Sequence, residues 1–184
     1  QKFDFIKGFE NGVLEFESIK KNNTSKSVLK IDNFKVKEVP VLAQLLTLAS
    51  LQGIADSLTG EGIRFTDFEM IFSNKDKLMK IDEIYAIGPA ISIMMSGYIQ
   101  SKELVSLRGT LVPARTINRT IASIPVLGDI LVGKKVGEGV FGLSFKIKGL
   151  ENDLKTTVNP VKTLAPRFIT RAVEAAKKRK AKQQ

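Results

Sequence analysis

Hydrophobic and polar residues alternate over several stretches of the chain, and this pattern predicts a fold built mainly from β-strands. The alternation is most regular near position 145, where one face would carry Phe141, Leu143, Phe145 and Ile147. Further strands are predicted over residues 62–74, 77–88, 90–99 and 103–112. The links between them are too short for helical crossovers, so the sequence favours an antiparallel meander.

The first 40 residues are also predicted to be strands. The stretches 2–9 and 12–19 flank Asn11-Gly12, a pair that suits a tight hairpin turn, so we expect the chain to open with a hairpin. A third strand is expected over residues 27–39, and its imperfect alternation indicates a bulge. The stretch 90–99 is apolar on both faces, which predicts a central strand covered on both sides.

The pattern changes to a helical one after Pro40. Residues 40–59 predict one helix or two short ones, with breaks at Gly53 and Gly60. Because its apolar residues cover more than one face, this segment is expected to lie in the core or across another apolar surface. A helical hairpin is expected over residues 113–133, and a C-terminal amphipathic helix from about Val161 to Ala176. The predicted fold class is therefore α+β, mainly an antiparallel meandering sheet with helices covering one face.

Composition narrows the possible chemistry. The chain has 184 residues without cysteine or histidine, which excludes disulfides, thiolate catalysis and the commonest metal ligand. No metal and no cofactor are expected. No apolar run is long enough to span a bilayer. Because the chain begins at Gln1 without methionine, we expect a mature product or a piece of a longer protein, with any anchor upstream.

The segment GEGVFG at 137–142 matches the GxGxxG pattern of nucleotide-binding loops. A dinucleotide site requires a helix after the last glycine, whereas a strand is predicted here. The other segments of a protein kinase are missing as well. The glycines are therefore interpreted as a turn, and no nucleotide is expected to bind.

The carboxylates give no clear catalytic site. Asp82 and Glu83 are neighbours on a predicted strand and are expected to point to opposite faces. Asp67 and Glu69 share a face, where a cation or two lysines could sit. Ser144 lies outside a nucleophile elbow, and no histidine exists to activate it. The protein is predicted not to be an enzyme.

The order of segments in residues 123–171 resembles the C-terminal region of the AsmA-like family, large bacterial envelope proteins that include TamB-type and YhdP-type members. The segments are SIPVLGDILVG, then GEGVFGLSFKIKG, then LKTTVNPVKTLAPRFITR. Two turn positions depart from the family pattern, since Leu154 replaces a common proline and Arg167 a common glycine. The resemblance implies a single AsmA-like C-terminal domain over residues 1–176, followed by a basic tail at 177–184.

The resemblance also implies a function. Family members form a β-groove that is anchored in the inner membrane of Gram-negative bacteria, crosses the periplasm and guides phospholipids towards the outer membrane. For this chain, acyl chains would be the partners, and the groove candidates are Phe68, Met70, Phe72, Ile91, Ile93, Met95, Phe141, Leu143, Phe145 and Ile147. The same residues would equally suit a filled core, because most alternating strands bury one face. In that case the domain would be a cap or a structural module.

Basic residues concentrate at the C-terminal end. Lysine and arginine exceed aspartate and glutamate by ten. Six basic residues fall in the last fourteen positions: Arg171, Lys177, Lys178, Arg179, Lys180 and Lys182. This run is interpreted as a solvated tail or as a contact for an anionic membrane surface or an envelope protein. Nucleic acid is a weaker alternative because no aromatic residue interrupts the run.

Overall fold

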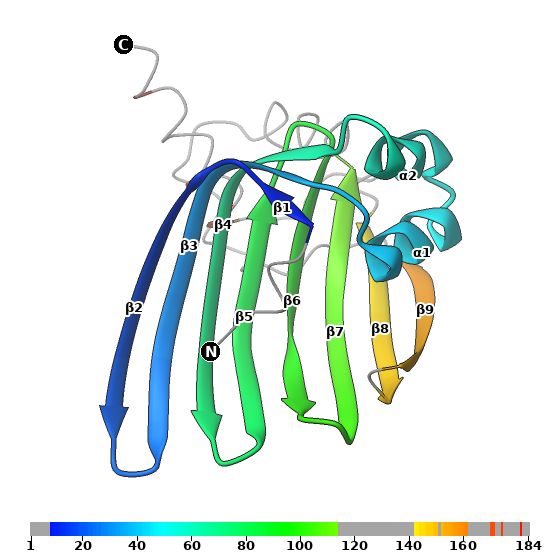
Figure 1. Cartoon of the computed structure of the whole chain (residues 1–184). Coiled ribbons are helices and arrows are strands. Elements are labelled where there is room, and N and C mark those ends of the chain that lie inside the picture. The colour runs from blue at the N-terminus through cyan, green and yellow to red at the C-terminus, as the bar shows by residue number, and fades with distance from the viewer. Residues whose placement is uncertain are drawn as a thin grey trace, which may run out of the picture.

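The computed structural model describes residues 8–113, 142–150 and 152–161, together with Thr170, Arg171, Glu174 and Ala181. Within these ranges nine strands form one antiparallel sheet, and two helices lie against it (Figure 1). The strand order is β1-β3-β4-β5-β6-β7-β8-β9, and β2 pairs with β3 beside β1. The described sheet is not closed, because β2 and β9 each pair with one neighbour. A mainly antiparallel β fold is thus confirmed.

The strands alternate in direction along the whole sheet. Their bounds are β1 Phe9–Glu10, β2 Val13–Lys21, β3 Thr24–Val36, β4 Ile63–Lys75, β5 Leu78–Ile87, β6 Ile91–Gln100, β7 Leu104–Pro113, β8 Gly142–Leu150 and β9 Asp153–Val161. The predicted meander over β4 to β7 is confirmed, with positive φ at Asp76 and Lys102 in two of the connections. β6 is central, and its residues Ile91 to Ile93 are at most 5% exposed.

The predicted N-terminal hairpin is wrong for the described residues. Both β1 and β2 pair with β3, through Glu10 opposite Lys35 and Val13 opposite Asp32. Asn11 and Gly12 have φ of 62° and 92°, as the sequence suggested. This conformation bends the chain between β1 and β2, which both pair with β3, and does not reverse its direction. The first hairpin instead joins β2 to β3, next to Asn22 with φ of 54°.

The irregularity expected in β3 lies at Asn33. Its φ is 53°, and the alternation of buried residues changes phase there. As a result Leu29 and Ile31 before it and Phe34 after it are all at most 3% exposed. The ring of Phe34 stacks on Phe65 of β4, with 5.4 Å between ring centroids. The register with β4 does not shift there, since Asp32 pairs with Asp67 and Phe34 with Phe65, so the expected bulge is wrong. The positive φ at Asn33 nevertheless keeps both halves of β3 in one core.

The helical segment forms two helices, α1 (Pro40–Leu48) and α2 (Gln52–Thr59), so the two-helix alternative is confirmed. Pro40 occupies the first turn of α1, where its missing N–H costs nothing. The break lies next to Ser50, whose φ is 57°, and Gly53 lies inside α2, contrary to the prediction. α2 ends at Gly60 as expected.

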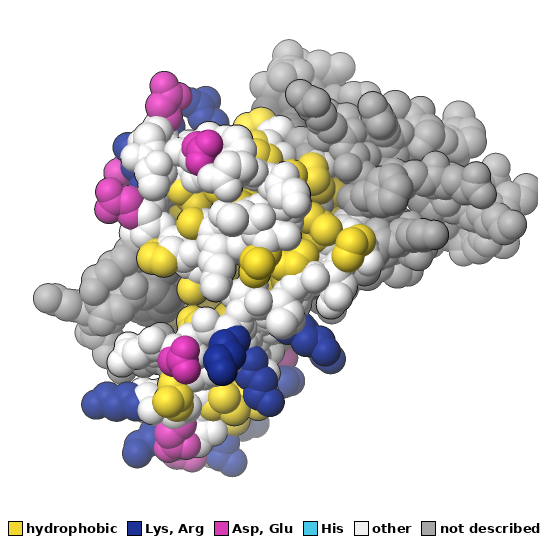
Figure 2. All heavy atoms as spheres, turned by 90° about the vertical axis from the view of Figure 1, so that its right-hand side faces the viewer, with side chains coloured by type: hydrophobic (Ala, Val, Ile, Leu, Met, Phe, Trp, Pro, Cys, Tyr) yellow, Lys and Arg dark blue, Asp and Glu magenta, His cyan; other side chains and the backbone are white. Residues whose placement is uncertain are grey.

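Both helices lie near the end of the sheet formed by β8 and β9 (Figure 1). Thr156 of β9 donates its Oγ1–H to Oε1 of Gln44 in α1 at 3.0 Å. The side of the molecule with α1, α2 and β9 shows scattered hydrophobic side chains over the helices, and lysine and arginine side chains gathered towards the lower end (Figure 2). Leu48 of α1 is 50% exposed.

Two predicted helical segments lie largely outside the described residues. In the expected helical hairpin at 113–133, only Pro113 is described, and it ends β7. In the C-terminal helix, Thr170, Arg171 and Glu174 are described and helical. None of the described helices has the length and apolar character needed to cross a membrane.

Candidate functional site on the two faces of the sheet

The groove candidates gather on one face of the sheet, which we call the inner face because α1 and α2 pack on it. Nine of the ten belong to one hydrophobic cluster, on β4, β6 and β8: Phe68, Met70, Phe72, Ile91, Ile93, Met95, Leu143, Phe145 and Ile147. The tenth, Phe141, lies outside the described residues. The cluster also contains residues of β3, β5 and β7 that sequence reasoning missed, among them Leu29, Ile84 and Leu111.

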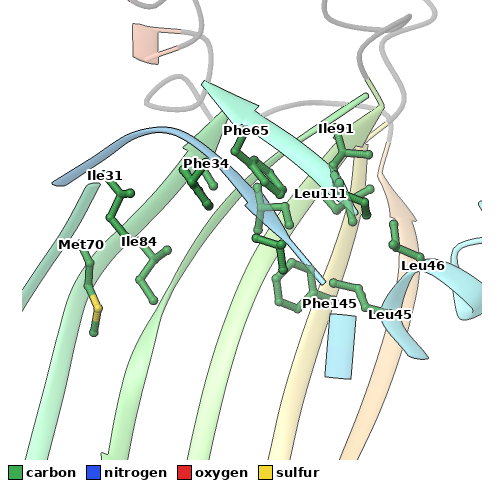
Figure 3. Close-up of a cluster of buried hydrophobic side chains, with 14 of the residues drawn as sticks. Ile31, Phe34, Leu45, Leu46, Phe65, Met70, Ile84, Ile91, Leu111 and Phe145 are labelled. Carbon is green, nitrogen blue, oxygen red and sulfur yellow. The ribbon is translucent and has the colours of Figure 1, made fainter. Parts of the chain in front are cut away.

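Most of these side chains are buried in the described conformation. Exposed fractions do not exceed 5% for Met70, Phe72, Ile91, Ile93, Phe145 and Ile147. Figure 3 shows Leu45 of α1 beside Phe145 of β8, while Met70 lies at the other side of the cluster. The middle of the inner face is therefore a packed core, the alternative that the sequence left open.

The inner face becomes more exposed towards the β2 edge. Leu14 and Phe16 stand opposite the inner-face residues Ile31 and Leu29, yet they are 49% and 43% exposed. The ring of Phe16 lies 6.5 Å from that of Phe72, measured between centroids. The apolar surface thus continues from the covered core to an accessible edge.

A polar contact borders this exposed part of the inner face. The hydroxyls of Ser18 and Ser27 are 2.9 Å apart and share a hydrogen bond across β2 and β3. Ser27 is only 4% exposed, so the bond satisfies a buried polar group. The apolar strip at the β2 edge therefore ends at a serine pair.

The opposite, outer face holds an ion-pair cluster around Arg171. Its Nη2 lies 2.7 Å from Oε1 of Glu83 and 2.8 Å from Oε1 of Glu69. Its guanidinium carbon also lies 5.7 Å from the ring centroid of Tyr85. Burial alone lowers the pKa of Arg171, but the hydrogen bond to Glu83 and the charges of Glu69 and Glu83 outweigh it, and the pKa is raised. The guanidinium is thus permanently charged.

This cluster changes two expectations about carboxylates. Asp82 and Glu83 were expected on opposite faces, but the register of β5 shifts between Ile81 and Ile84. Both side chains reach the outer face, where Lys80 binds Asp82 at 2.8 Å and Arg171 binds Glu83. A bulge places two residues opposite one and so breaks simple alternation. Glu69 does hold a cation, Arg171, whereas Asp67 accepts a hydrogen bond from Thr66.

Beside this cluster the outer face is hollowed into a pocket of about 420 Å³. Its floor spans β6, β7 and β8, with Ser96 opposite Arg108 and Arg108 opposite Lys146. The next row contains Thr110 opposite Ser144. The described residues that line it are Asp82, Glu83, Met94, Met95, Ser96, Arg108, Gly109, Thr110, Ser144, Phe145, Lys146 and Asn159. Sequence analysis did not find this pocket, because its residues come from five strands.

The remaining expectations concern the basic run and the glycine motif. Of the basic run only Arg171 is described, and carboxylates engage it. Lys177, Lys178, Arg179, Lys180 and Lys182 lie outside the described residues. So do residues 137–141 of the glycine motif, and the turn itself is therefore not described. Gly142 lies in strand β8 and not in a turn, but the strand predicted after the motif is confirmed. The described residues contain no acidic cluster suited to a metal ion.

Comparison with known protein families, with curated proteins and with solved structures found no match to this chain. The resemblance to the AsmA-like family therefore stays a prediction.

Proposed function

We propose that this chain is a non-enzymatic segment of a bacterial envelope protein that guides phospholipids between the inner and outer membranes. In this proposal it is a periplasmic part of an inner-membrane-anchored protein and has the AsmA-like fold suggested by the sequence. One observation carries the proposal: the apolar inner face of an unclosed sheet extends from a helix-covered core to the exposed Leu14 and Phe16.

The β2 edge has the properties that an acyl chain needs. Burying a methylene group is favourable by about 0.8 kcal/mol, so a lipid tail lying along Leu14 and Phe16 would be stabilised without any directional bond. The serine pair at Ser18 and Ser27 marks where the apolar strip becomes polar. A head group would stay in water beyond it, since a charged group cannot enter an apolar strip without a partner.

The helices cover one side of the apolar inner face and leave the other side accessible. α1 packs against β9 and against α2, whereas the side chains of β2 are exposed. An acyl chain can therefore enter from the β2 side but cannot continue past Leu45 and Leu46, which are at most 2% exposed. We propose that the domain closes one end of a lipid-conducting groove.

The proposal can be tested by placing a charge on either face of β2. Leu14→Asp puts a carboxylate in the apolar strip, while Ile19→Asp puts one on the outer face of the same strand, where Ile19 is 77% exposed. Both variants should fold, because both positions are exposed. In the full-length protein Leu14→Asp should abolish transfer of a fluorescent phospholipid between vesicles, and Ile19→Asp should not. Normal transfer by Leu14→Asp would refute the proposal.

The charge of the chain favours a second function, a capping domain that binds an anionic membrane surface or an envelope partner through its basic C-terminal end. The formal net charge is +10. Clustered lysine and arginine residues gain roughly 1 kcal/mol each near an anionic surface. Arg171 does not contribute to such a contact, because it already binds Glu69 and Glu83. The tail residues would have to supply it.

A further inference from the structure

We propose that the outer-face pocket binds a phosphate group through Arg108 and Lys146. This inference is independent of the proposed lipid path, which runs on the other face of the sheet. It rests on the arrangement of cations and hydroxyls in the pocket.

The first observation is that two like charges stand directly opposite each other. Arg108 of β7 and Lys146 of β8 are Cα partners on the same face. Like charges directly opposite each other destabilise a sheet, and an anion bound between them would offset this repulsion. Among the described residues neither side chain has an ion-pair partner, so both charges are available to a ligand.

The acidic residues of the pocket do not neutralise these cations. Asp82 is bound by Lys80 at 2.8 Å, and Glu83 is bound by Arg171 at 2.7 Å. Each carboxylate therefore has its own cation outside the pair Arg108 and Lys146. Among the described residues, no carboxylate therefore neutralises Arg108 or Lys146.

The second observation is the position of the hydroxyl donors. Thr110 and Ser144 face each other two residues along β7 and β8 from Arg108 and Lys146. Neighbouring strands are about 4.8 Å apart, and residues i and i+2 of one strand are about 7 Å apart. The Cα atoms of the four residues therefore form a rectangle of about these dimensions, and a phosphate group could lie above it between the four side chains. Ser144 now donates to the carbonyl oxygen of Asn159 at 3.2 Å, and a rotation of its hydroxyl would redirect this donor.

The chemistry of these groups selects a phosphate. A guanidinium matches two phosphate oxygens with a planar pair of donors, and an ammonium adds a point charge. The pocket volume of about 420 Å³ leaves room for an organic substituent on the phosphate. The side chain of Met94 offers that substituent an apolar contact. The ligand class is therefore a phosphomonoester, either soluble or exposed on a lipid head group.

The test uses sodium phosphate and glycerol phosphate against sodium chloride of equal ionic strength, with binding followed by NMR of backbone amides. We expect saturable shifts at residues 108–110 and 144–146 with either phosphate compound and not with chloride. Arg108→Gln combined with Lys146→Gln should weaken phosphate binding by about tenfold or more, since charge-assisted bonds are lost. The control removes two exposed charges from the same face, in Lys21→Gln with Lys26→Gln, and should bind normally.

A second arm distinguishes the two sources of phosphate. The full chain is sedimented with phosphatidylcholine vesicles that contain phosphatidic acid, with and without competing glycerol phosphate. Vesicle binding that the pocket variant loses, and that the soluble compound displaces, assigns the site to a head group. Binding of the soluble compounds alone assigns it to a free phosphomonoester. Absence of both, or equal losses in the control, would overturn the proposal.

Discussion

The Nη2 atom of Arg171 lies 2.7 Å from Oε1 of Glu83, a carboxylate whose side chain is only 4% exposed. The contact joins residue 171 to β5 across 88 positions of the chain. Because Nε of Arg171 also donates to Oε1 of Glu83 at 3.1 Å, the guanidinium uses two donors on one oxygen. Arg171 therefore attaches this part of the C-terminal region to the outer face of the sheet.

Removing this arginine should destabilise the protein. Arg171→Ala removes the guanidinium that binds the buried Glu83, so we expect the free energy of unfolding to fall by about 3 kcal/mol. Arg171→Lys should recover part of that loss, because an ammonium keeps the charge but not the fork of donors. Glu174→Gln is the control, since its carboxylate is 56% exposed and 3.9 Å from Arg171, and it should change stability by less than about 0.5 kcal/mol. Urea titration of the three variants would measure these differences, and an unchanged midpoint for Arg171→Ala would contradict this account.

Alanine substitution at two glycines should change the stability of the protein in opposite directions. A Cβ on Gly109 would lie 2.3 Å from the carbonyl oxygen of Met94 and 2.6 Å from the ring of Phe145, so Gly109→Ala should cost about 1–3 kcal/mol. A Cβ on Gly53 in α2 would meet nothing within 4 Å, and Gly53→Ala should add up to about 1 kcal/mol through helix propensity. Thermal melts of both variants would check the signs, and a neutral Gly109→Ala would show that β6 and β8 can move apart.

Two buried serines of the sheet should also differ. The hydroxyl of Ser92 is fully buried and has no hydrogen-bond partner among the described residues, so Ser92→Ala should leave stability unchanged or raise it by up to about 1 kcal/mol. Ser27→Ala removes the bond to Ser18 and should cost about 1 kcal/mol. Both changes delete one oxygen, so each is a control for the other in denaturant titration. A clear loss for Ser92→Ala would mean that its hydroxyl is satisfied in solution.

The sequence predicted the meander well because the periodicity of β4, β6 and β8 is a local property. The prediction failed where a single residue interrupts the alternation of side chains between the two faces of the sheet. The bulge at Asp82 and Glu83 inserts a residue into β5. The two side chains therefore lie on the same face of the sheet, whereas simple alternation predicted opposite faces. Asn11 and Gly12 have the φ values of a turn, but tertiary pairing with β3 decides that the chain continues along one edge.

In the candidate sites, too, some features follow from local periodicity and others depend on tertiary structure. Alternation placed Phe68, Met70 and Phe72 on one face, but only packing against α1 and neighbouring strands decides whether such a face is core or groove. The outer pocket depends on register, because Arg108 and Lys146 are 38 positions apart and meet only when β7 pairs with β8. No local pattern encodes that distance. Arg171 likewise joined a basic run in the sequence, yet its partners lie on β4 and β5.

The basic tail can be tested separately from the sheet. Removing residues 177–184 should weaken binding to acidic liposomes and reduce its salt dependence, because exposed charges are screened by salt. Stability should hardly change, since Arg171 and its carboxylate partners remain. Co-sedimentation at several salt concentrations measures the effect. Equal liposome binding by the truncated protein would show that the tail is simply solvated.

The proposed lipid path predicts where a phospholipid touches the protein. A photoreactive amino acid at position 16 would lie on the inner face at the β2 edge, while one at position 17 would lie on the outer face of the same strand. Both positions are exposed, so access by solvent is matched. The most direct measurement is crosslinking of the full-length protein in living cells, followed by mass spectrometry of the adducts. We predict phospholipid adducts at position 16 and none at position 17; equal labelling at both positions, or no lipid at position 16, would contradict a lipid path along the inner face.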